Sequence, residues 1–139
     1  MPTYDEVEVG AQLPSQTFSI TRADLVRYCG ASGDFNVIHW NARIAQAVGL
    51  PDVIAHGMCT MATAGRVVTD WAGDAGAVES YGVRFSRPVV VPDDDRGAVL
   101  SVKGTVEDKR EDGSVVVGLV ATVDGGKVLT NAKAVVRLR

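Results

Sequence analysis

The sequence has few cysteine, histidine and aromatic residues and no excess of basic charge, and these shortages exclude several classes of protein. Its two cysteines, Cys29 and Cys59, form no disulfide framework, which excludes a disulfide-stabilised miniprotein and favours a reducing cytoplasm. Fourteen Lys and Arg face 17 Asp and Glu, and the net charge of −3 argues against nucleic acid binding. No apolar run approaches the roughly 18 residues of a membrane span, and the acidic N-terminus has no signal-peptide core. We therefore expect a cytoplasmic protein that binds neither nucleic acid nor membrane.

Valine and alanine are abundant instead. They supply 24 and 16 residues of a chain of 139, against eight aromatic residues. Branching at Cβ suits the pleated surface of a sheet, so the valines favour a substantial β-sheet, while the alanines favour at least one closely packed helix. The length suits one domain and is too short for two of ordinary size. We expect residues 1–139 to form a single α+β domain.

Helical signals lie in the first half of the chain and strand signals in the second. We expect helices over 22–29, with Thr21 as N-cap, over 42–48 and over 57–71. The longest should bury a stripe of small and apolar residues: Met58, Met61, Ala62, Gly65, Val68 and Ala72. Its opposite face should carry Thr60, Thr63, Arg66 and Asp70. Strands are expected over 18–20, 78–85, 99–106, 115–123 and 128–138, with hairpin turns at Asp112-Gly113 and Asp124-Gly125-Gly126.

The only two histidines, His39 and His56, lie in the two segments that carry the most unusual residues. The first segment reads Ser32-Gly33-Asp34-Phe35-Asn36-Val37-Ile38-His39, and the second reads Ile54-Ala55-His56-Gly57-Met58. If the loop curls, Asp34 and His39 can aim at one point, hold a water molecule and move protons in both directions. The same spacing also suits groups that only cap a loop through hydrogen bonds to nearby backbone, and spacing alone favours that interpretation.

Gly57 lies at the expected start of the long helix. A glycine in the first turn leaves a bare backbone N–H at the positive end of the helix dipole, where a ligand oxygen can approach closely. That geometry suits an oxyanion developing on a carbonyl group. A glycine that merely lets the chain turn into the helix explains the local sequence equally well.

The two segments together resemble a known family. The first is similar to the Asp-x-Asn-Pro-(Ile/Leu)-His motif of the MaoC-like, or (R)-specific, enoyl hydratases and (3R)-hydroxyacyl-thioester dehydratases. The second resembles the Ile-Ala-His-Gly-Met stretch that opens the central helix of that family. Val83-Arg84-Phe85, followed by Pro88-Val89, also resembles the family's first long strand, and the similarity runs from about residue 10 to the C-terminus. The resemblance implies a hot-dog fold, in which a curved antiparallel sheet wraps a long central helix.

The resemblance also implies an activity and a set of site residues. The expected enzyme is a hydro-lyase of fatty acid metabolism that needs no cofactor or metal. It would add water reversibly to trans-2-enoyl thioesters of CoA or acyl carrier protein, giving (3R)-hydroxyacyl thioesters. Asp34 and His39 match the pair that binds and activates water, and the Gly57 amide matches the donor to the thioester carbonyl. Asn36 matches the residue that braces the loop. The positions expected at the substrate are Asn36, Ile54, Ala55 and Met58.

Two further expectations concern the assembly and the loop. The resemblance implies a dimer, either with an identical chain or with a related hot-dog subunit. Val37 stands where the family usually has proline, so the loop lacks the restriction that a proline ring imposes on its own and the preceding residue. Arg66, Arg84 and Arg87 are candidate contacts for the phosphate of CoA or for a pantetheine arm.

Three alternatives remain open from the sequence. His56 and Cys59 would share a helix face and could form a zinc site with Asp34 and His39, although Cys59 has no Cys-x-x-Cys partner. Hot-dog proteins also include acyl thioesterases, which would release free thiol. A catalytically silent subunit that only shapes an acyl tunnel is the third alternative, and the presence of both Asp34 and His39 argues against it.

Overall fold

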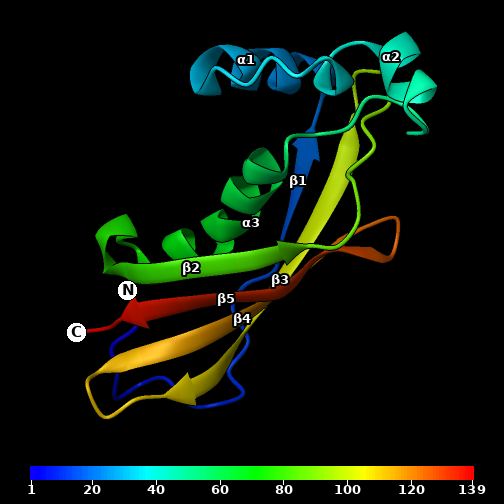
Figure 1. Cartoon of the computed structure of the whole chain (residues 1–139). Helices are drawn as coiled ribbons and strands as arrows, with labels where there is room; N and C mark the ends of the chain where they lie inside the picture. Colours follow the sequence, from blue (N-terminus) through cyan, green and yellow to red (C-terminus); the bar gives the residue numbers. More distant parts are fainter.

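Five antiparallel strands form one curved sheet in the computed structural model, which describes residues 1–139 (Figure 1). The strands are β1 (Gln16–Ile20), β2 (Val78–Phe85), β3 (Ala98–Lys109), β4 (Ser114–Val123) and β5 (Gly126–Arg137). Their order across the sheet is β1-β3-β4-β5-β2, so β1 and β2 are the two edges. All five expected strands are confirmed, and β2 has the bounds expected for it.

The hairpins β3–β4 and β4–β5 confirm both expected turns. Asp124 and Gly125 have φ angles of 49° and 77°, the pair of positive values that a two-residue type I′ turn requires. In the other hairpin Gly113 has a φ of 86°, and the Asp112 carboxylate accepts hydrogen bonds from the backbone and hydroxyl of Ser114. These hydrogen bonds lower the pKa of Asp112. Local turn chemistry therefore sets the register of the three long central strands.

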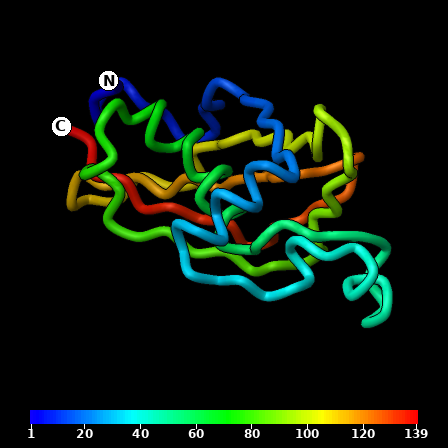
Figure 2. Tube along the Cα trace, turned by 90° about the horizontal axis from the view of Figure 1, so that it is seen from above, coloured from blue at the N-terminus to red at the C-terminus, as the bar shows by residue number.

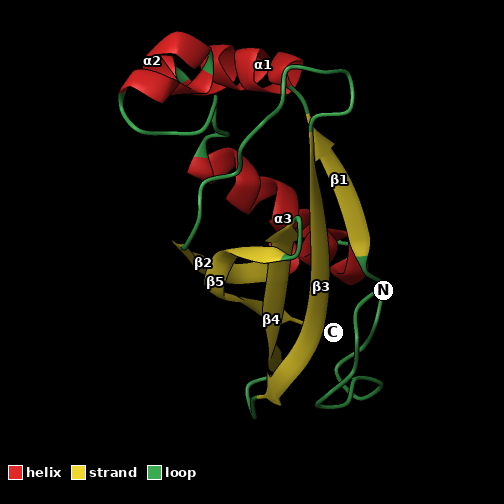
Figure 3. Ribbon diagram, turned by 90° about the vertical axis from the view of Figure 1, so that its right-hand side faces the viewer, coloured by secondary structure: helices red, strands yellow, loops and turns green.

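Helix α3 (Gly57–Ala72) lies across the concave face of the sheet and contacts strands β2 to β5 (Figures 1 and 3). Around it lies a core of 26 buried apolar residues, of which 12 are valine and seven are alanine. Six of these valines lie in strands β3 to β5 and two lie in α3, and the small alanines let the two layers approach. This arrangement confirms the α+β class and the hot-dog fold.

The buried face of α3 differs from the expected one. Its buried residues are Thr60, Ala64, Val67, Val68 and Ala72. Only Val68 and Ala72 belong to the stripe expected from the sequence, while Ala62 is exposed and Met58 is 58% exposed. Thr60 was expected on the outer face; it is tolerated in the core because its hydroxyl donates to the carbonyl oxygen of His56, one turn earlier. A hydropathy scale does not include this hydrogen bond between a threonine hydroxyl and the helix backbone.

The Tyr81 ring of β2 covers Gly65 on this helix. A Cβ at Gly65 would lie 2.9 Å from Cε1 of that ring, so the close approach requires glycine. The Tyr81 hydroxyl donates to the carbonyl oxygen of Met61 at 2.8 Å, and burial raises the pKa of Tyr81 to about 12. The tyrosine thereby fixes α3 against the edge strand.

Two shorter helices, α1 (Arg22–Ser32) and α2 (Ala42–Ala47), lie together beyond one end of the sheet (Figures 1 and 3), and α2 projects from the rest of the chain in Figure 2. Thr21 caps α1 as expected, in a capping box with Asp24. The hydrogen bonds from Thr21 lower the pKa of Asp24. The helix runs three residues beyond its expected end, to the left-handed Gly33, whose φ is 75°. No helix in the structure is both long enough and apolar enough to cross a membrane.

Candidate active site

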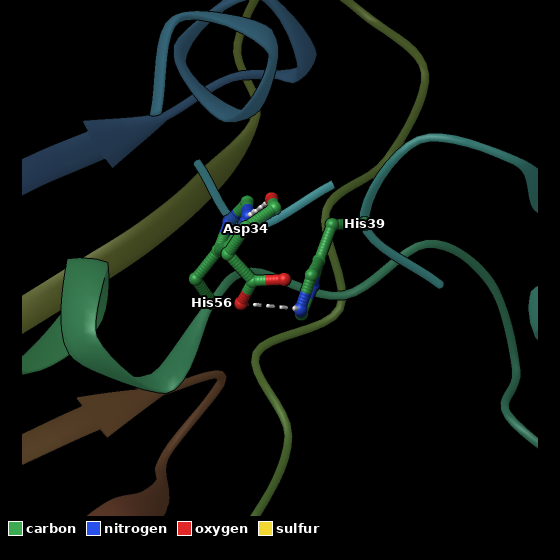
Figure 4. A group of neighbouring side chains, drawn as sticks. All are labelled: Asp34, His39 and His56. Carbon is green, nitrogen blue, oxygen red and sulfur yellow. Dashed lines mark hydrogen bonds and ion pairs between the residues drawn. The ribbon is translucent and has the colours of Figure 1, made fainter. Parts of the chain in front are cut away.

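Three polar side chains meet where the loop after α1 passes the N-terminus of α3: Asp34, His39 and His56 (Figure 4). His39 lies in a short 3-10 turn, η1 (Val37–His39), and His56 is the N-cap of α3. The Oδ2 atom of Asp34 lies 3.9 Å from Nε2 of His39. The rings of His39 and His56 stack with centroids 3.8 Å apart and planes at 23°. The structure therefore brings together the two side chains that the sequence singled out.

The loop that carries Asp34 is held by side chains that accept hydrogen bonds from backbone amides two residues onward. Ser32 Oγ accepts from Asp34 N–H, Asp34 Oδ1 accepts from Asn36 N–H, and Asn36 Oδ1 accepts from Ile38 N–H. The loop-capping interpretation thus describes Asp34 and Asn36 correctly. It does not exclude a chemical role, because Asp34 caps the loop with Oδ1 and leaves Oδ2 facing His39.

The orientation of His39 is set by the backbone of the second segment. Its Nδ1 lies 2.7 Å from the carbonyl oxygen of Ile54, and a carbonyl oxygen only accepts, so Nδ1 carries the proton. In the neutral ring the lone pair is then on Nε2, the atom that faces Asp34. The side chain is 8% exposed, whereas that of Asp34 is 52% exposed. A buried imidazole of fixed orientation therefore lies beside a carboxylate that solvent can reach.

A cavity of about 380 Å³ opens beside this pair. Its walls come from the second segment, the first turn of α3, the chain after β2, and β5. The lining residues are His39, Ile54, Ala55, Gly57, Thr60, Phe85, Ser86, Arg87, Pro88, Val89, Val128 and Leu129. Of the residues expected at the substrate, Ile54 and Ala55 line the cavity. Asn36 does not line it and braces the loop instead, while Met58 lies on the exposed side of the first helical turn.

Gly57 lies at the wall of this cavity as the first residue of α3. Its N–H is one of the amides at a helix N-terminus that have no acceptor within the helix. A Cβ at this position would lie 3.0 Å from the Phe85 ring, so the absence of a side chain lets that ring cover the helix terminus. The cavity wall thus includes His39 and the first residue of α3, and the Asp34 carboxylate lies 3.9 Å from His39 Nε2.

The three arginines considered from the sequence lie in different places. Arg87 lines the cavity, and its guanidinium lies against Gly126 at the start of β5. Arg66 lies over the ring of Phe18, 5.0 Å from its centroid, and does not line this cavity. Arg84 is exposed on β2 and does not line it either. Only Arg87 is placed to meet a group entering the site.

The zinc tetrad considered from the sequence is not assembled. One ligand atom each of Asp34, His39 and His56 lie within 4.8 Å of one another, but Cys59 is not in this group. Burial raises the pKa of the Cys59 thiol, which disfavours the thiolate that zinc binds. The two stacked imidazoles are nearly parallel, so their in-plane lone pairs run side by side and do not converge on a tetrahedral ion. The donor geometry therefore does not fit a zinc centre.

Sequence reasoning missed the groups on α1 that contact this site. Cys29, not Cys59, is the cysteine beside a histidine, with its Sγ 3.7 Å from Nε2 of His56. The Tyr28 ring lies 4.6 Å from the His56 ring, centroid to centroid. The available signal was the helical spacing of the buried Leu25 and Cys29, which marks the inward face of α1 but does not indicate what that face covers.

Comparisons with known proteins relate this chain to one family. Residues 7–124 match the family model described as a MaoC like domain. Over 79 residues the chain is 40% identical to 3-hydroxyacyl-thioester dehydratase X of Mycobacterium tuberculosis, an alignment that covers 57% of this chain and 27% of that protein. The chain spans between 25% and 37% of the length of the curated relatives that it matches.

Two solved structures extend the comparison to the fold. A MaoC-like dehydratase superposes with a TM-score of 0.95 at 40% identity, covering 99% of this chain and 42% of the other. The R-hydratase PhaJ1 from Pseudomonas aeruginosa superposes with a TM-score of 0.83 at 28% identity, covering 98% of this chain and 84% of the other. The similarity therefore includes nearly every residue of this chain.

Proposed function

The chain belongs to the family of MaoC-like domains, and on that premise we propose that it hydrates trans-2-enoyl thioesters reversibly to (3R)-hydroxyacyl thioesters. The observation that carries the proposal is the position of His39. Its Nε2 faces the Asp34 carboxylate at 3.9 Å, and the residue borders the same cavity as Gly57. A base, an acid and an oxyanion donor are the three groups that addition of water across an enoyl thioester requires.

The proposed chemistry follows from these positions. Two groups 3.9 Å apart can both hydrogen-bond one water at about 2.8 Å, so Asp34 and His39 would hold the nucleophile between them. His39 Nε2 takes a proton as the water oxygen attacks C3, and negative charge moves to the thioester oxygen. The Gly57 N–H stabilises that charge, and the proton taken from the water passes through Asp34 to C2, which returns both side chains to their starting states. In dehydration the same groups exchange their acid and base roles.

The size of the cavity supports a thioester substrate whose acyl group is small. Its volume of about 380 Å³ is near the lower end of the range for small-molecule sites. We assign Ile54 and Ala55 to contact with the substrate, Asn36 to bracing of the loop, and Met58 to contact from the open side of the helix terminus. Arg87 would meet a phosphate of the CoA or acyl carrier protein arm. In this account the site needs neither a cofactor nor a metal.

The proposal extends to the assembly and the cellular setting. We infer that residues 1–139 form one catalytic domain that works in cytoplasmic fatty acid metabolism. We also infer that it pairs with an identical chain or a related hot-dog subunit. Strand β2 supports pairing because it bonds only to β5 and leaves its other edge without a strand partner.

An assay with two readouts tests the activity. The purified chain is mixed with crotonyl-CoA and with longer trans-2-enoyl thioesters, while enoyl absorbance and free thiol are followed together. The proposal expects absorbance to fall to an equilibrium value with no thiol release. A parallel assay uses a saturated acyl-CoA, and thiol release from that substrate would identify a thioesterase. Unchanged absorbance with every substrate would leave a silent acyl-binding subunit as the better description.

A further inference from the structure

His56 contacts each part of the site without lining the cavity. Its side chain is buried, and its Nε2 lies 3.0 Å from the backbone carbonyl oxygen of Asp34. Its ring lies beside that of His39 (Figure 4), on which it stacks, and its peptide bond leads directly to Gly57. One side chain thus contacts the loop of the carboxylate and the ring of the base, and its backbone precedes the helix-terminal donor.

The side chain of His56 does not cap helix α3. At an N-cap position a side chain ordinarily accepts a hydrogen bond from an amide of the first turn, but His56 makes no such bond. Its Nδ1 is fully buried and has no hydrogen-bond partner. A buried acceptor without a partner lowers stability, so a serine or aspartate would serve a cap better. The one good hydrogen bond of the side chain goes to the Asp34 loop.

Neighbouring groups fix the orientation of the ring. Because the Asp34 carbonyl only accepts, Nε2 of His56 carries the proton. Turning the ring over would aim a carbon or a lone pair at that carbonyl oxygen. Cys29 Sγ lies 3.7 Å from the same nitrogen, and the Tyr28 ring lies 4.6 Å from the His56 ring, centroid to centroid, so two residues of α1 contact the ring.

We propose that His56 is a positioning residue that sets the separation between the Asp34 carboxylate and His39 Nε2. The proposal rests on the hydration activity proposed above. A shift of about 1 Å in an acid–base pair costs on the order of 100-fold in rate, so a lost anchor on the Asp34 backbone acts on turnover. Substrate binding depends on the cavity walls, which His56 does not line, and is left largely intact.

Two amide variants separate the hydrogen bond from the ring. In His56→Gln the amide nitrogen can occupy the place of Nε2 and donate to the Asp34 carbonyl. In His56→Asn the same amide is one carbon shorter and cannot reach that oxygen. His56→Phe keeps a ring on His39 but has no donor. We expect the His56→Asn and His56→Phe variants to have a kcat about 10- to 100-fold lower, with KM changed by less than about threefold. The kcat of the His56→Gln variant should be about tenfold higher than that of His56→Asn.

Two readouts do not depend on turnover. Amide hydrogen exchange over residues 33–39 should be faster in the Asn variant than in the Gln variant, which should match the unmodified chain. Nitrogen NMR of the imidazoles should show His56 protonated on Nε2. If the unmodified chain hydrates no thioester, the activity proposal fails, and the exchange and NMR results alone decide whether His56 positions the loop.

Several results would overturn the inference. These are equal kcat values for the Gln and Asn variants, a loss of kcat that follows only the loss of unfolding free energy, and a His56 ring protonated on Nδ1. If the Asn variant does not fold, the Phe variant takes its place against Gln, because it lacks the same donor.

Discussion

The Nδ1 atom of His39 lies 2.7 Å from the carbonyl oxygen of Ile54, and this contact between two distant loops determines which nitrogen can act as a base. With Nδ1 donating, the Nε2 lone pair is directed toward Asp34 and the cavity. The backbone of the second segment therefore orients the imidazole that we propose as the base.

Replacing Asp34 with asparagine should reduce hydration by about 10²- to 10⁴-fold, because an amide cannot exchange the proton that the carboxyl group moves. The fold should persist, since the amide oxygen can still accept from Asn36 N–H. Steady-state kinetics and thermal unfolding measure the two effects. Asp94→Asn is a matched control, because Asp94 accepts from the amides of Arg96 and Gly97 in a similar turn away from the site. Near-normal turnover in Asp34→Asn would end the assignment of Asp34.

Replacing His39 with asparagine should also abolish most turnover. The Asn side-chain N–H can occupy the place of Nδ1 and keep the bond to Ile54, but no base remains at the position of Nε2. We expect a loss of about 10²- to 10⁴-fold in kcat with little change in unfolding temperature. Comparison with His39→Ala, which removes both groups, shows the part of the loss that is due to the lost anchor. An active Asn variant would mean that the base lies elsewhere.

Gly57→Ala should lower kcat/KM by about tenfold or more, because the new methyl group would lie 3.0 Å from the Phe85 ring and displace the helix terminus or the ring. In a Phe85→Leu background the alanine meets no ring. Gly57→Ala should therefore lower kcat/KM much less in that background than it does in the unmodified chain. Initial rates on one enoyl thioester provide the comparison.

A control for this experiment lies in the same helix. Gly65→Ala would place a methyl group 2.9 Å from the Tyr81 ring, a similar clash away from the cavity around His39. It should lower the unfolding temperature without a specific effect on kcat. Equal effects of both alanines on kcat/KM at equal loss of stability would show that the Gly57 amide has no special role.

Arg87→Gln should raise KM for CoA thioesters by about tenfold with kcat nearly unchanged, since a charge-assisted hydrogen bond to a phosphate is lost. The effect should shrink with a pantetheine thioester, which lacks the nucleotide phosphates of CoA. Arg84→Gln, on the exposed part of β2, should leave both substrates unaffected. A similar rise in KM for CoA and pantetheine thioesters would contradict a phosphate contact.

Strands and turns were predictable because their signals are local. The valine-rich segments of β3 to β5 and the Asp-Gly pairs at their ends indicate strands and turn type within a few residues. The face of α3 was not predictable to the same degree, since Thr60 is buried through a hydrogen bond that hydropathy does not measure. The sequence did not show how far α1 extends, because Gly33 ends it inside a run of turn formers.

In the site too, residues in local motifs were predictable, whereas contacts between distant segments were not. Asp34, His39 and Gly57 were identified from two short motifs, and the structure brings all three to one place. The contact of Cys29 with His56 joins residues 27 positions apart, and that of His39 with Ile54 joins residues 15 apart. Neither has a sequence signature, because each depends on how α1, the loop and α3 pack together. Tertiary contacts of this kind determine the tautomers on which the proposed chemistry depends.

The most direct test of the central claim is the configuration of the product. The purified chain is incubated with crotonyl-CoA, and the 3-hydroxybutyryl group formed is separated by chiral chromatography, alongside the Asp34→Asn and His39→Asn variants. We expect (3R)-hydroxybutyryl-CoA from the unmodified chain and almost none from either variant. A (3S) product, or equal yields from the variants, would contradict that claim.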